Sequence, residues 1–359
     1  MNDVAELKSY IEVHAKGQGL DGYREVLARI GSDDGAEPGS WAAEWCREGE
    51  RLEKLGRFLE ASRHYAMARF PYVDGDARHD ALERCVTAFD RWRADVPAIE
   101  RLDVKLEEGL VRCWTSGLSS APAKPLLIMM GGNMTVKEQW APMLVHAERL
   151  GMAAIVTEMP SVGENTVPYE PSSHRVVSRL LDEVADRADV SRTHLTMLSF
   201  SGHLALRCAV DDDRIKGVIT VGAPIRSFFL DRDWYGRIPG ITAATLAHMT
   251  GKEEGVAGDA AWALTPAELE GLTIPVAYAA SLRDEVIPYE DVRLVKERVR
   301  RLDLVEYDDV HASPGHTQEN QLWTTRALLR ARGVRGPATA TLAVMLAVAR
   351  LRRRLRRAA

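Results

Sequence analysis

Between residues 126 and 307 the chain alternates short apolar runs with stretches of helical periodicity. The runs are Leu126–Met130, Ala153–Thr157, Leu195–Leu198, Val218–Val221, Pro275–Ala280 and Leu304–Tyr307. Short, mostly apolar runs of this kind are typical of strands buried on both faces of a parallel sheet. We therefore predict an α/β fold with a doubly wound, mostly parallel sheet. In such folds ligands bind beyond the carboxyl ends of the strands, so the residues after each run are the first candidates for function.

Residues 1–118 have a different pattern, which predicts an N-terminal helical region. Between Trp41 and Ala68 the apolar residues recur every three or four positions, or at multiples of that spacing, and so lie near one stripe of a helix. They are Trp41, Trp45, Leu52, Leu55, Leu59 and Tyr65. Because such a stripe must be buried against a partner, a homodimer is one arrangement that we expect to suit this region.

A segment rich in Ser, Gly and Pro, residues 116–125, separates the helical region from a catalytic domain that we expect over residues 119–335. Within that domain residues 225–270 are too long for a plain connection between elements. The segment carries several aromatic residues (Phe228, Phe229, Trp234, Tyr235 and Trp262). We expect an insertion that covers the active site and forms an apolar pocket for a small ligand.

The C-terminal segment, residues 336–359, joins an apolar stretch to six arginines. The apolar part is shorter than the ~20 residues that cross a bilayer. Two interpretations remain open. The segment is either a basic amphipathic helix that contacts an anionic membrane surface or a loosely docked terminal helix. The second interpretation is favoured.

Composition excludes several classes of function. The 47 Lys and Arg residues against 52 Asp and Glu give a net charge of −5, which excludes binding of nucleic acid by bulk electrostatics. The four cysteines are far apart and form no C-x-x-C pair, so neither a zinc ribbon nor a disulfide framework is indicated. The first residues lack the apolar core of a secretory signal. We expect a cytoplasmic enzyme.

The segment LTMLSFSGHLALR, residues 195–207, predicts a strand, a sharp turn and a helix with no loop between them. Such a turn raises one side chain above the sheet, as in a nucleophile elbow. Ser199 is the better nucleophile, because Ser201 and Gly202 then occupy the positions that need small residues. With Ser201 as nucleophile, His203 falls where glycine is expected. A serine that merely caps the helix is the alternative without catalysis.

An acid and a base follow Ser199 in the chain order typical of α/β-hydrolases, each just after a predicted strand. Asp284 follows the run 275–280, with Glu285 beside it as an alternative acid. Two histidines follow the run 304–307. His311 is favoured by its short distance from the strand, and His316 remains an alternative base.

The loop after the first strand, MMGGNMTVKEQW, is the candidate for anion stabilisation. Gly131, Gly132 and Asn133 allow backbone N–H groups to face an oxyanion, and the amide of Phe200 is the second donor. Gly-Gly also occurs in ordinary turns. No Gly-Lys-Ser/Thr, G-x-G-x-x-G or H-E-x-x-H motif is present, so we expect no cofactor and no metal.

Five motifs together resemble the FrsA-like branch of the α/β-hydrolase superfamily. They are GGNMTVKE at 131–138, EMPSVGE at 158–164, SFSGHLA at 199–205, GAPIRSFF at 222–229 and RDEVIP at 283–288. The resemblance covers roughly residues 40–330, with Trp41–Ala68 similar to the family's helical region. It implies a triad of Ser199, Asp284 and His311, and a helical region that helps to enclose the substrate.

The elbow departs from the family pattern. Relatives usually carry glycine two residues before the nucleophile and Gly-Gly after it, whereas this chain has Met197 and Ser201–Gly202. The branch includes esterases, hydrolases of C–C bonds in aromatic polyketides, and enzymes of tetronate polyketide pathways that eliminate acetate. The altered elbow favours the last group and hence a role in antibiotic biosynthesis.

The resemblance therefore implies an enzyme that removes an acyloxy group, acetate, from a small polyketide-type ester, by elimination or by serine-mediated hydrolysis. A general carboxylesterase and a C–C hydrolase or cyclase acting on a β-dicarbonyl polyketide are alternatives that use the same triad. A non-catalytic binding protein that has kept the fold is an alternative from another class.

Overall fold

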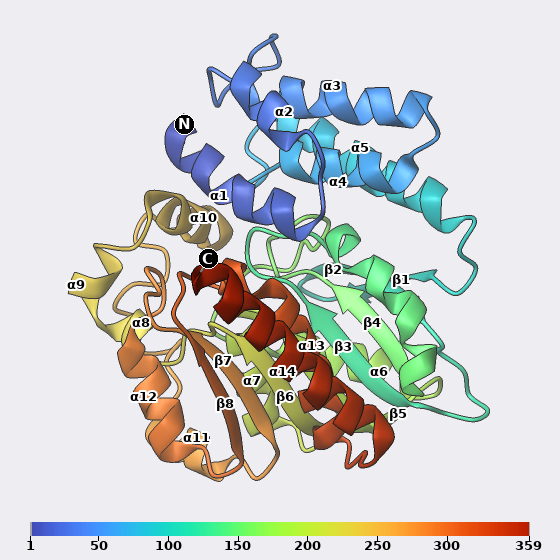
Figure 1. The fold of residues 1–359 in the computed structure, drawn as a ribbon, viewed down its shortest axis with the longest axis vertical. Coiled ribbons are helices and arrows are strands. Elements are labelled where there is room, and N and C mark those ends of the chain that lie inside the picture. The colour runs from blue at the N-terminus through green and yellow to red at the C-terminus, as the bar shows by residue number, and fades with distance from the viewer. Residues whose placement is uncertain (1, 359) are drawn as a thin grey trace. The chain divides into compact units, whose positions relative to one another are not determined.

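The strands form one mostly parallel sheet in the order β1-β2-β4-β3-β5-β6-β7-β8 (Figure 1). The computed structural model describes residues 2–358, with side chains at all of these positions except 354 and 356–358. The predicted α/β class is confirmed. The six predicted runs correspond to β3 (Pro125–Met130), β4 (Ala153–Thr157), β5 (Asp189–Met197), β6 (Ile215–Val221), β7 (Val276–Ser281) and β8 (Leu302–Tyr307).

The chain divides into two compact units. Unit 1 comprises residues 1–118, 129–173 and 238–256, and unit 2 comprises residues 119–128, 174–237 and 257–359. One of the divisions falls between residues 118 and 119, whereas position 335 lies inside the last segment of unit 2. Residues 129–173 group with the N-terminal region, and the expected insertion 225–270 is shared between the units. The C-terminal segment belongs to unit 2.

Unit 1 begins with helices whose apolar faces pack on one another. They are α1 (Val4–Gly17), α2 (Tyr23–Arg29), α3 (Trp41–Lys54), α4 (Phe58–Ala68) and α5 (Asp76–Arg93). The single helix expected after Trp41 is wrong, because the chain turns at Gly56 (φ +73°) and Leu55 is exposed. Gly49 allows α3 and α4 to approach closely, since a Cβ there would lie 2.5 Å from the ring of Tyr65.

The expectation of helix throughout residues 1–118 is also wrong. A hairpin of β1 (Glu100–Leu106) and β2 (Gly109–Ser116) follows α5, and β2 pairs antiparallel with β4. Strand β1 has no continuous apolar run, because it buries only alternate residues, Leu102 and Val104. Alternation of this kind marks a strand with one solvated face.

The rest of unit 1 consists of short helices that connect these strands and one helix from later in the chain. Three short 3₁₀ helices, η1 (Lys137–Gln139), η2 (Ala141–His146) and η3 (Glu148–Leu150), lie between β3 and β4. Helix α10 (Gly240–Thr250) contacts α1, and Glu6 on α1 accepts the amide N–H of Ile241 at 3.0 Å.

Unit 2 contains the parallel part of the sheet, in which β5, β6, β7 and β8 pair in sequence order. Its helices are α6 (Arg175–Glu183), α7 (Phe200–Asp211), α8 (Ser227–Leu230), α9 (Arg232–Tyr235), α11 (Pro266–Gly271), α12 (Tyr289–Arg298), α13 (Thr317–Ala331) and α14 (Pro337–Ala358), with η4 (Pro314–His316) before α13. Because the strands run in one direction, the segments that follow β5, β7 and β8 meet at the same edge of the sheet.

The C-terminal segment is a helix docked on α13. Figure 1 shows α14 crossing in front of the strands of unit 2. Leu346 and Ala349 are buried in this contact, and the guanidinium of Arg353 donates to Glu319 at 2.5 Å. Val344, Val348, Leu351 and Leu355 are exposed. No helix in residues 2–358 is both long enough and apolar enough to span a membrane.

Candidate active site

Ser199 lies at the sharp turn between β5 and α7. Its backbone has φ +57° and ψ −125°, a conformation that costs free energy in a residue other than glycine and that is typical of a nucleophile elbow. The turn is held by a hydrogen bond from the Ser199 N–H to the carbonyl of Val221 at 2.8 Å. Position 202 has no room for a side chain, because a Cβ there would lie 1.9 Å from the hydroxyl of Thr220.

The three side chains implied by the family resemblance form one hydrogen-bonded chain. Ser199 Oγ lies 2.9 Å from His311 Nε2, and His311 Nδ1 lies 3.0 Å from both carboxylate oxygens of Asp284. All three residues belong to unit 2 and are contributed from beyond the ends of β5, β8 and β7. A hydroxyl, an imidazole and a carboxylate in this order can activate the hydroxyl as a nucleophile or transfer protons at the imidazole.

The acidic groups around His311 favour its protonated form. Burial lowers the pKa of the imidazole, but the charge and hydrogen bond of Asp284 and the charge of Glu285 outweigh it, so the net pKa is raised above its ordinary 6.5. Asp284 Oδ1 also accepts the amide N–H groups of Val286 and Ile287 at 2.9 and 2.8 Å, which fix the carboxylate.

The alternatives left open by the sequence lie in other environments. The hydroxyl of Ser201 donates to the carbonyl of Leu198 at 2.9 Å, within its own turn. His316 is buried, lies 2.8 Å from a carboxylate oxygen of Asp309 and stacks on Tyr307. Glu285 accepts the backbone N–H of His311 at 3.0 Å, whereas the imidazole itself faces Asp284.

Gly222 is a site residue to which the sequence analysis assigned no role. It follows β6 with φ +62°, and a Cβ there would lie 3.0 Å from His311 Cε1 and 3.6 Å from Asp284 Oδ2. The imidazole therefore packs directly on the backbone of Gly222. The available signal was a glycine immediately after a predicted strand, at the start of the GAPIRSFF motif.

Asp291 on α12 fixes the later part of this motif. Its buried carboxylate accepts backbone N–H groups of residues 225–228 at 2.6–3.3 Å. Burial raises the pKa of Asp291, and the four amide donors oppose that shift. In the same segment Phe228 contacts Phe200 edge to face, with ring centroids 5.3 Å apart. The first part of the expected insertion thus packs beside the elbow within unit 2.

The predicted anion-stabilising residues fall in both units. Phe200, whose amide begins α7 directly after Ser199, is in unit 2, whereas Gly131, Gly132 and Asn133 are in unit 1. Position 131 has no room for a side chain, because a Cβ there would lie 2.1 Å from both Thr135 Oγ1 and Trp140 Nε1. The role of residues 131–133 in anion binding stays a prediction of the sequence.

A buried ionic network in unit 1 joins two of the family motifs. Lys137 Nζ lies 3.2 Å from Glu158 and 2.7 Å from Glu164, and the Lys137 backbone N–H donates to Glu158 at 3.0 Å. Burial raises the pKa of Glu158 to about 7, against the opposing charge of Lys137. The network fixes residues 131–138 against residues 158–164. No cluster of three or more His, Cys, Asp or Glu side chains within residues 2–358 has an arrangement that could hold a metal ion.

The fold and this hydrogen-bonded chain define an α/β-hydrolase with a Ser–His–Asp arrangement at the carboxyl ends of its strands. The chain belongs to the FrsA-like family, since the family model described as "Esterase FrsA-like" matches residues 36–302. Esterase FrsA of Vibrio vulnificus strain YJ016 is 24% identical over 323 residues, which cover 77% of this chain and 77% of that protein. The resemblance stated from the motifs is confirmed.

Two solved structures extend the comparison. The structure of wild-type AbyA5 has a TM-score of 0.92 and 47% identity, and the match covers 96% of this chain and 99% of that chain. The 2,6-dihydroxy-pseudo-oxynicotine hydrolase has a TM-score of 0.67 at 20% identity, over 89% of this chain and 96% of that chain, which supports the fold alone.

Proposed function

We propose that this chain is a serine-triad enzyme of secondary metabolism that removes acetate from a small polyketide-type ester. The observation that carries the proposal is the 2.9 Å hydrogen bond between Ser199 Oγ and His311 Nε2, with Asp284 behind the imidazole. Membership of the FrsA-like esterase family supports acyl-ester chemistry. The resemblance of the motifs to acetate-eliminating enzymes of tetronate pathways supports the choice of leaving group.

In the hydrolytic route Ser199 Oγ attacks the ester carbonyl while His311 Nε2 accepts its proton. The amide of Phe200 is the oxyanion donor within unit 2. Collapse of the tetrahedral intermediate breaks the carbonyl C–O bond, and His311 protonates the departing alcohol. Water then attacks the acetyl-enzyme with His311 as base, so the acetate carries one oxygen from water and Ser199 is regenerated.

In the elimination route His311 Nε2 accepts a proton from the acidic carbon next to a substrate carbonyl. The electron pair of that C–H bond becomes the new C=C bond, and the C–O bond between the alkyl carbon and acetate breaks. Acetate departs with both of its original oxygens, and the imidazolium returns its proton to solvent. Ser199 forms no covalent bond here and only orients the imidazole.

Turnover of 4-acetoxy-2-butanone in ¹⁸O-labelled water tests the proposal and separates the routes. Hydrolysis yields 4-hydroxy-2-butanone and acetate with one ¹⁸O, whereas elimination yields methyl vinyl ketone and unlabelled acetate. An acetylated tetronate is the second probe. Ser199→Ala should abolish hydrolysis and should retain part of the elimination activity.

The matched control is His311→Gln, which removes the base in both routes, and buffer without protein gives the spontaneous rate. If the unaltered protein releases acetate from neither probe faster than buffer alone, the proposed function is wrong and a binding role is favoured. If release is fast but is unchanged in His311→Gln, another group is the base.

A further inference from the structure

Unit 2 contains a cavity of about 810 Å³ that none of the site residues above lines. Its floor includes Ile219 of β6 and residues at the amino-terminal ends of β7 and β8, and its walls come from α13, α14 and the turn between them. Ser199, Asp284 and His311 follow the carboxyl ends of β5, β7 and β8. The cavity therefore lies at the opposite end of the strands from the triad, and its volume is within the range of small-molecule sites.

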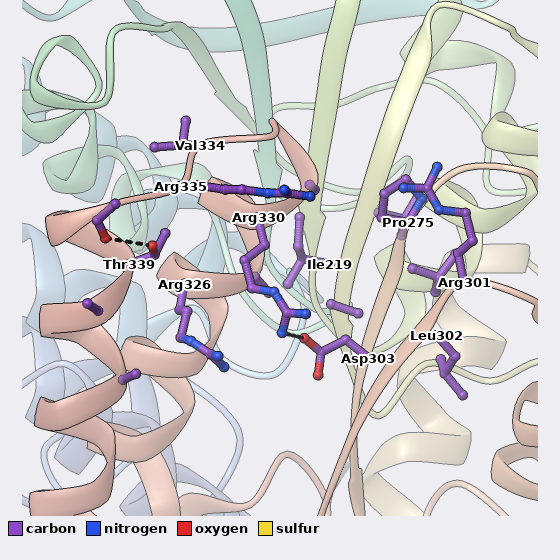
Figure 2. Close-up of a pocket in the computed structure, with 18 residues that line it drawn as sticks. Ile219, Pro275, Arg301, Leu302, Asp303, Arg326, Arg330, Val334, Arg335 and Thr339 are labelled. Carbon is purple, nitrogen blue, oxygen red and sulfur yellow. Dashed lines mark hydrogen bonds and ion pairs between the residues drawn. The ribbon is translucent and has the colours of Figure 1, made fainter.

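Arginine side chains dominate the charge of this cavity. Arg301, Arg326, Arg330 and Arg335 line it, together with one acidic residue, Asp303. Figure 2 shows Arg326 and Arg330 extending from α13 toward the strands, with Arg330 paired to Asp303 at 2.9 Å.

Within residues 2–358 the other three arginines form no ion pair with a carboxylate. The guanidinium of Arg301 donates to the carbonyl of Thr273 at 3.2 Å. Neither Arg326 nor Arg335 forms an ion pair with a carboxylate of residues 2–358. A group of like charges with a single internal counter-charge has a positive potential that attracts an anion.

Apart from Thr339, most of the remaining side chains that line the cavity are apolar, and several of them come from α14. They include Ala327 and Ala331 on α13 and Ala340 and Ala343 on α14. A second hollow of about 420 Å³ shares Arg326 and Ala343 with the first and continues past Leu346 to Leu351. The two hollows adjoin at Arg326 and Ala343, and we call them the groove. Its apolar length is the part lined by Ala343, Leu346, Ala347 and Leu351, beside which lies Arg350, whose guanidinium is 3.9 Å from Glu319.

We propose that this groove binds an amphipathic organic anion, with a carboxylate or phosphate head group held by Arg326 and Arg335 and an apolar chain along the alanine-lined walls. A guanidinium group matches the planar, bidentate geometry of these head groups, and it is more weakly hydrated than an ammonium group. The chain displaces water from the apolar walls. The site is independent of the chemistry proposed for Ser199.

Calorimetric titration of the full chain with octyl phosphate and octanoate tests the site. Octanol, which lacks the charge, and inorganic phosphate, which lacks the chain, are the matched ligands. We expect both amphipathic anions to bind at least ~10-fold more tightly than either control, because each control loses one of the two contributions. Tighter binding of octyl phosphate than of octanoate identifies a phosphate ligand, and the reverse identifies a carboxylate.

The double variant Arg326→Gln/Arg335→Gln locates the binding. Octyl phosphate should bind it at least ~10-fold more weakly, because charge-assisted hydrogen bonds are lost. Arg293→Gln/Arg298→Gln on α12 is the matched control, since these exposed arginines pair with Glu290 and Glu270 away from the groove. Thermal unfolding checks that each variant is folded.

Three results would overturn the proposal. They are no binding of either amphipathic anion at millimolar concentration, equal binding of octanol, and unchanged affinity in a folded Arg326→Gln/Arg335→Gln protein. Ala343→Phe provides a second check that does not alter charge. It fills the apolar length and should weaken octyl phosphate more than inorganic phosphate, and an equal effect on the two ligands would contradict the predicted path of the chain.

Discussion

The two ends of the parallel strands in unit 2 differ in how their polar groups are satisfied. At the carboxyl ends, Asp284 accepts two backbone amides and faces His311, which in turn contacts Ser199. At the amino ends, Arg326 and Arg335 surround a cavity without carboxylate partners in the described part of the chain. At the first end each of these polar groups has a partner within the chain, whereas the second end carries a net positive charge.

The two ends also differ in how their functional groups are held. The carboxyl ends hold strained backbone at Ser199, Ala312 and Ser313, all with positive φ, and such strain persists only where surrounding contacts fix it. At the amino ends, largely exposed arginine side chains lie beside apolar residues such as Ile219 and Ala327. Variants at the two ends should therefore affect different measurements.

The largest effect is expected from a comparison of the two histidines. His311→Gln keeps the size of the side chain but cannot transfer a proton, so kcat/KM for ester turnover should fall by on the order of 10⁴-fold or more. His316→Gln should leave kcat/KM nearly unchanged and lower the free energy of unfolding by about 1–3 kcal/mol, because the contact with Asp309 is weakened. Steady-state kinetics and urea unfolding measure the two effects. A fully active His311→Gln protein would refute the assignment.

Gly222→Ala tests the contact between the backbone and the imidazole. The added Cβ would lie 3.0 Å from His311 Cε1, so the ring must shift, and kcat/KM should fall by about 10–100-fold. The positive φ alone costs about 1–2 kcal/mol for alanine.

Gly251→Ala is the matched control for this strain. Its φ is +66°, and nothing lies within 4 Å of the position of its Cβ. It should share the loss of stability without the loss of activity. Equal kinetic effects of the two substitutions would show that Gly222 contributes only backbone conformation.

The sequence predicted those parts of the molecule that have a local signal. Six strands appear as apolar runs, and the strand–turn–helix around Ser199 appears as small residues at set positions. Strand β1 has no such run because it buries only alternate residues. Leu55 is exposed because the chain turns at Gly56, which ends the apolar stripe there.

The rest of the site depends on contacts between distant segments. His311 and His316 both follow the same predicted strand, and only the three-dimensional path of the loop sets His311 beside Ser199 and His316 beside Asp309. Asp291 looks like an ordinary helical acid in the sequence, although its carboxylate accepts amides from residues 225–228. The number of residues between two such contacting groups depends on the elements that lie between them. Sequence spacing alone therefore does not predict these contacts.

A smaller effect is expected on the pH dependence. The base must be neutral to accept a proton, and its pKa is raised above 6.5, so kcat/KM should rise with pH along a limb whose midpoint lies above 6.5.

Glu285→Gln removes one of the charges that raise this pKa but keeps an acceptor for the His311 N–H. The limb should move toward lower pH by a fraction of a unit. Glu290→Gln, which alters an exposed pair on α12, should not move it. A shift of the limb toward higher pH would contradict the electrostatic assignment.

The smallest effect on catalysis is expected at α14, which walls the amino-terminal cavity. Leu346→Ala removes a buried contact between α14 and the rest of unit 2 and should lower the free energy of unfolding by about 2 kcal/mol. Leu355→Ala, at a side chain that is 61% exposed, should change it by no more than about 0.5 kcal/mol. Because the cavity and the triad lie at opposite ends of the strands, kcat/KM should stay within about twofold in both variants.

Octyl phosphate affinity should fall in Leu346→Ala alone, since Leu346 lines the groove and Leu355 does not. A parallel loss of turnover and affinity in Leu346→Ala would mean that the two ends of the strands are coupled, and the independence inferred from their separation would then be wrong.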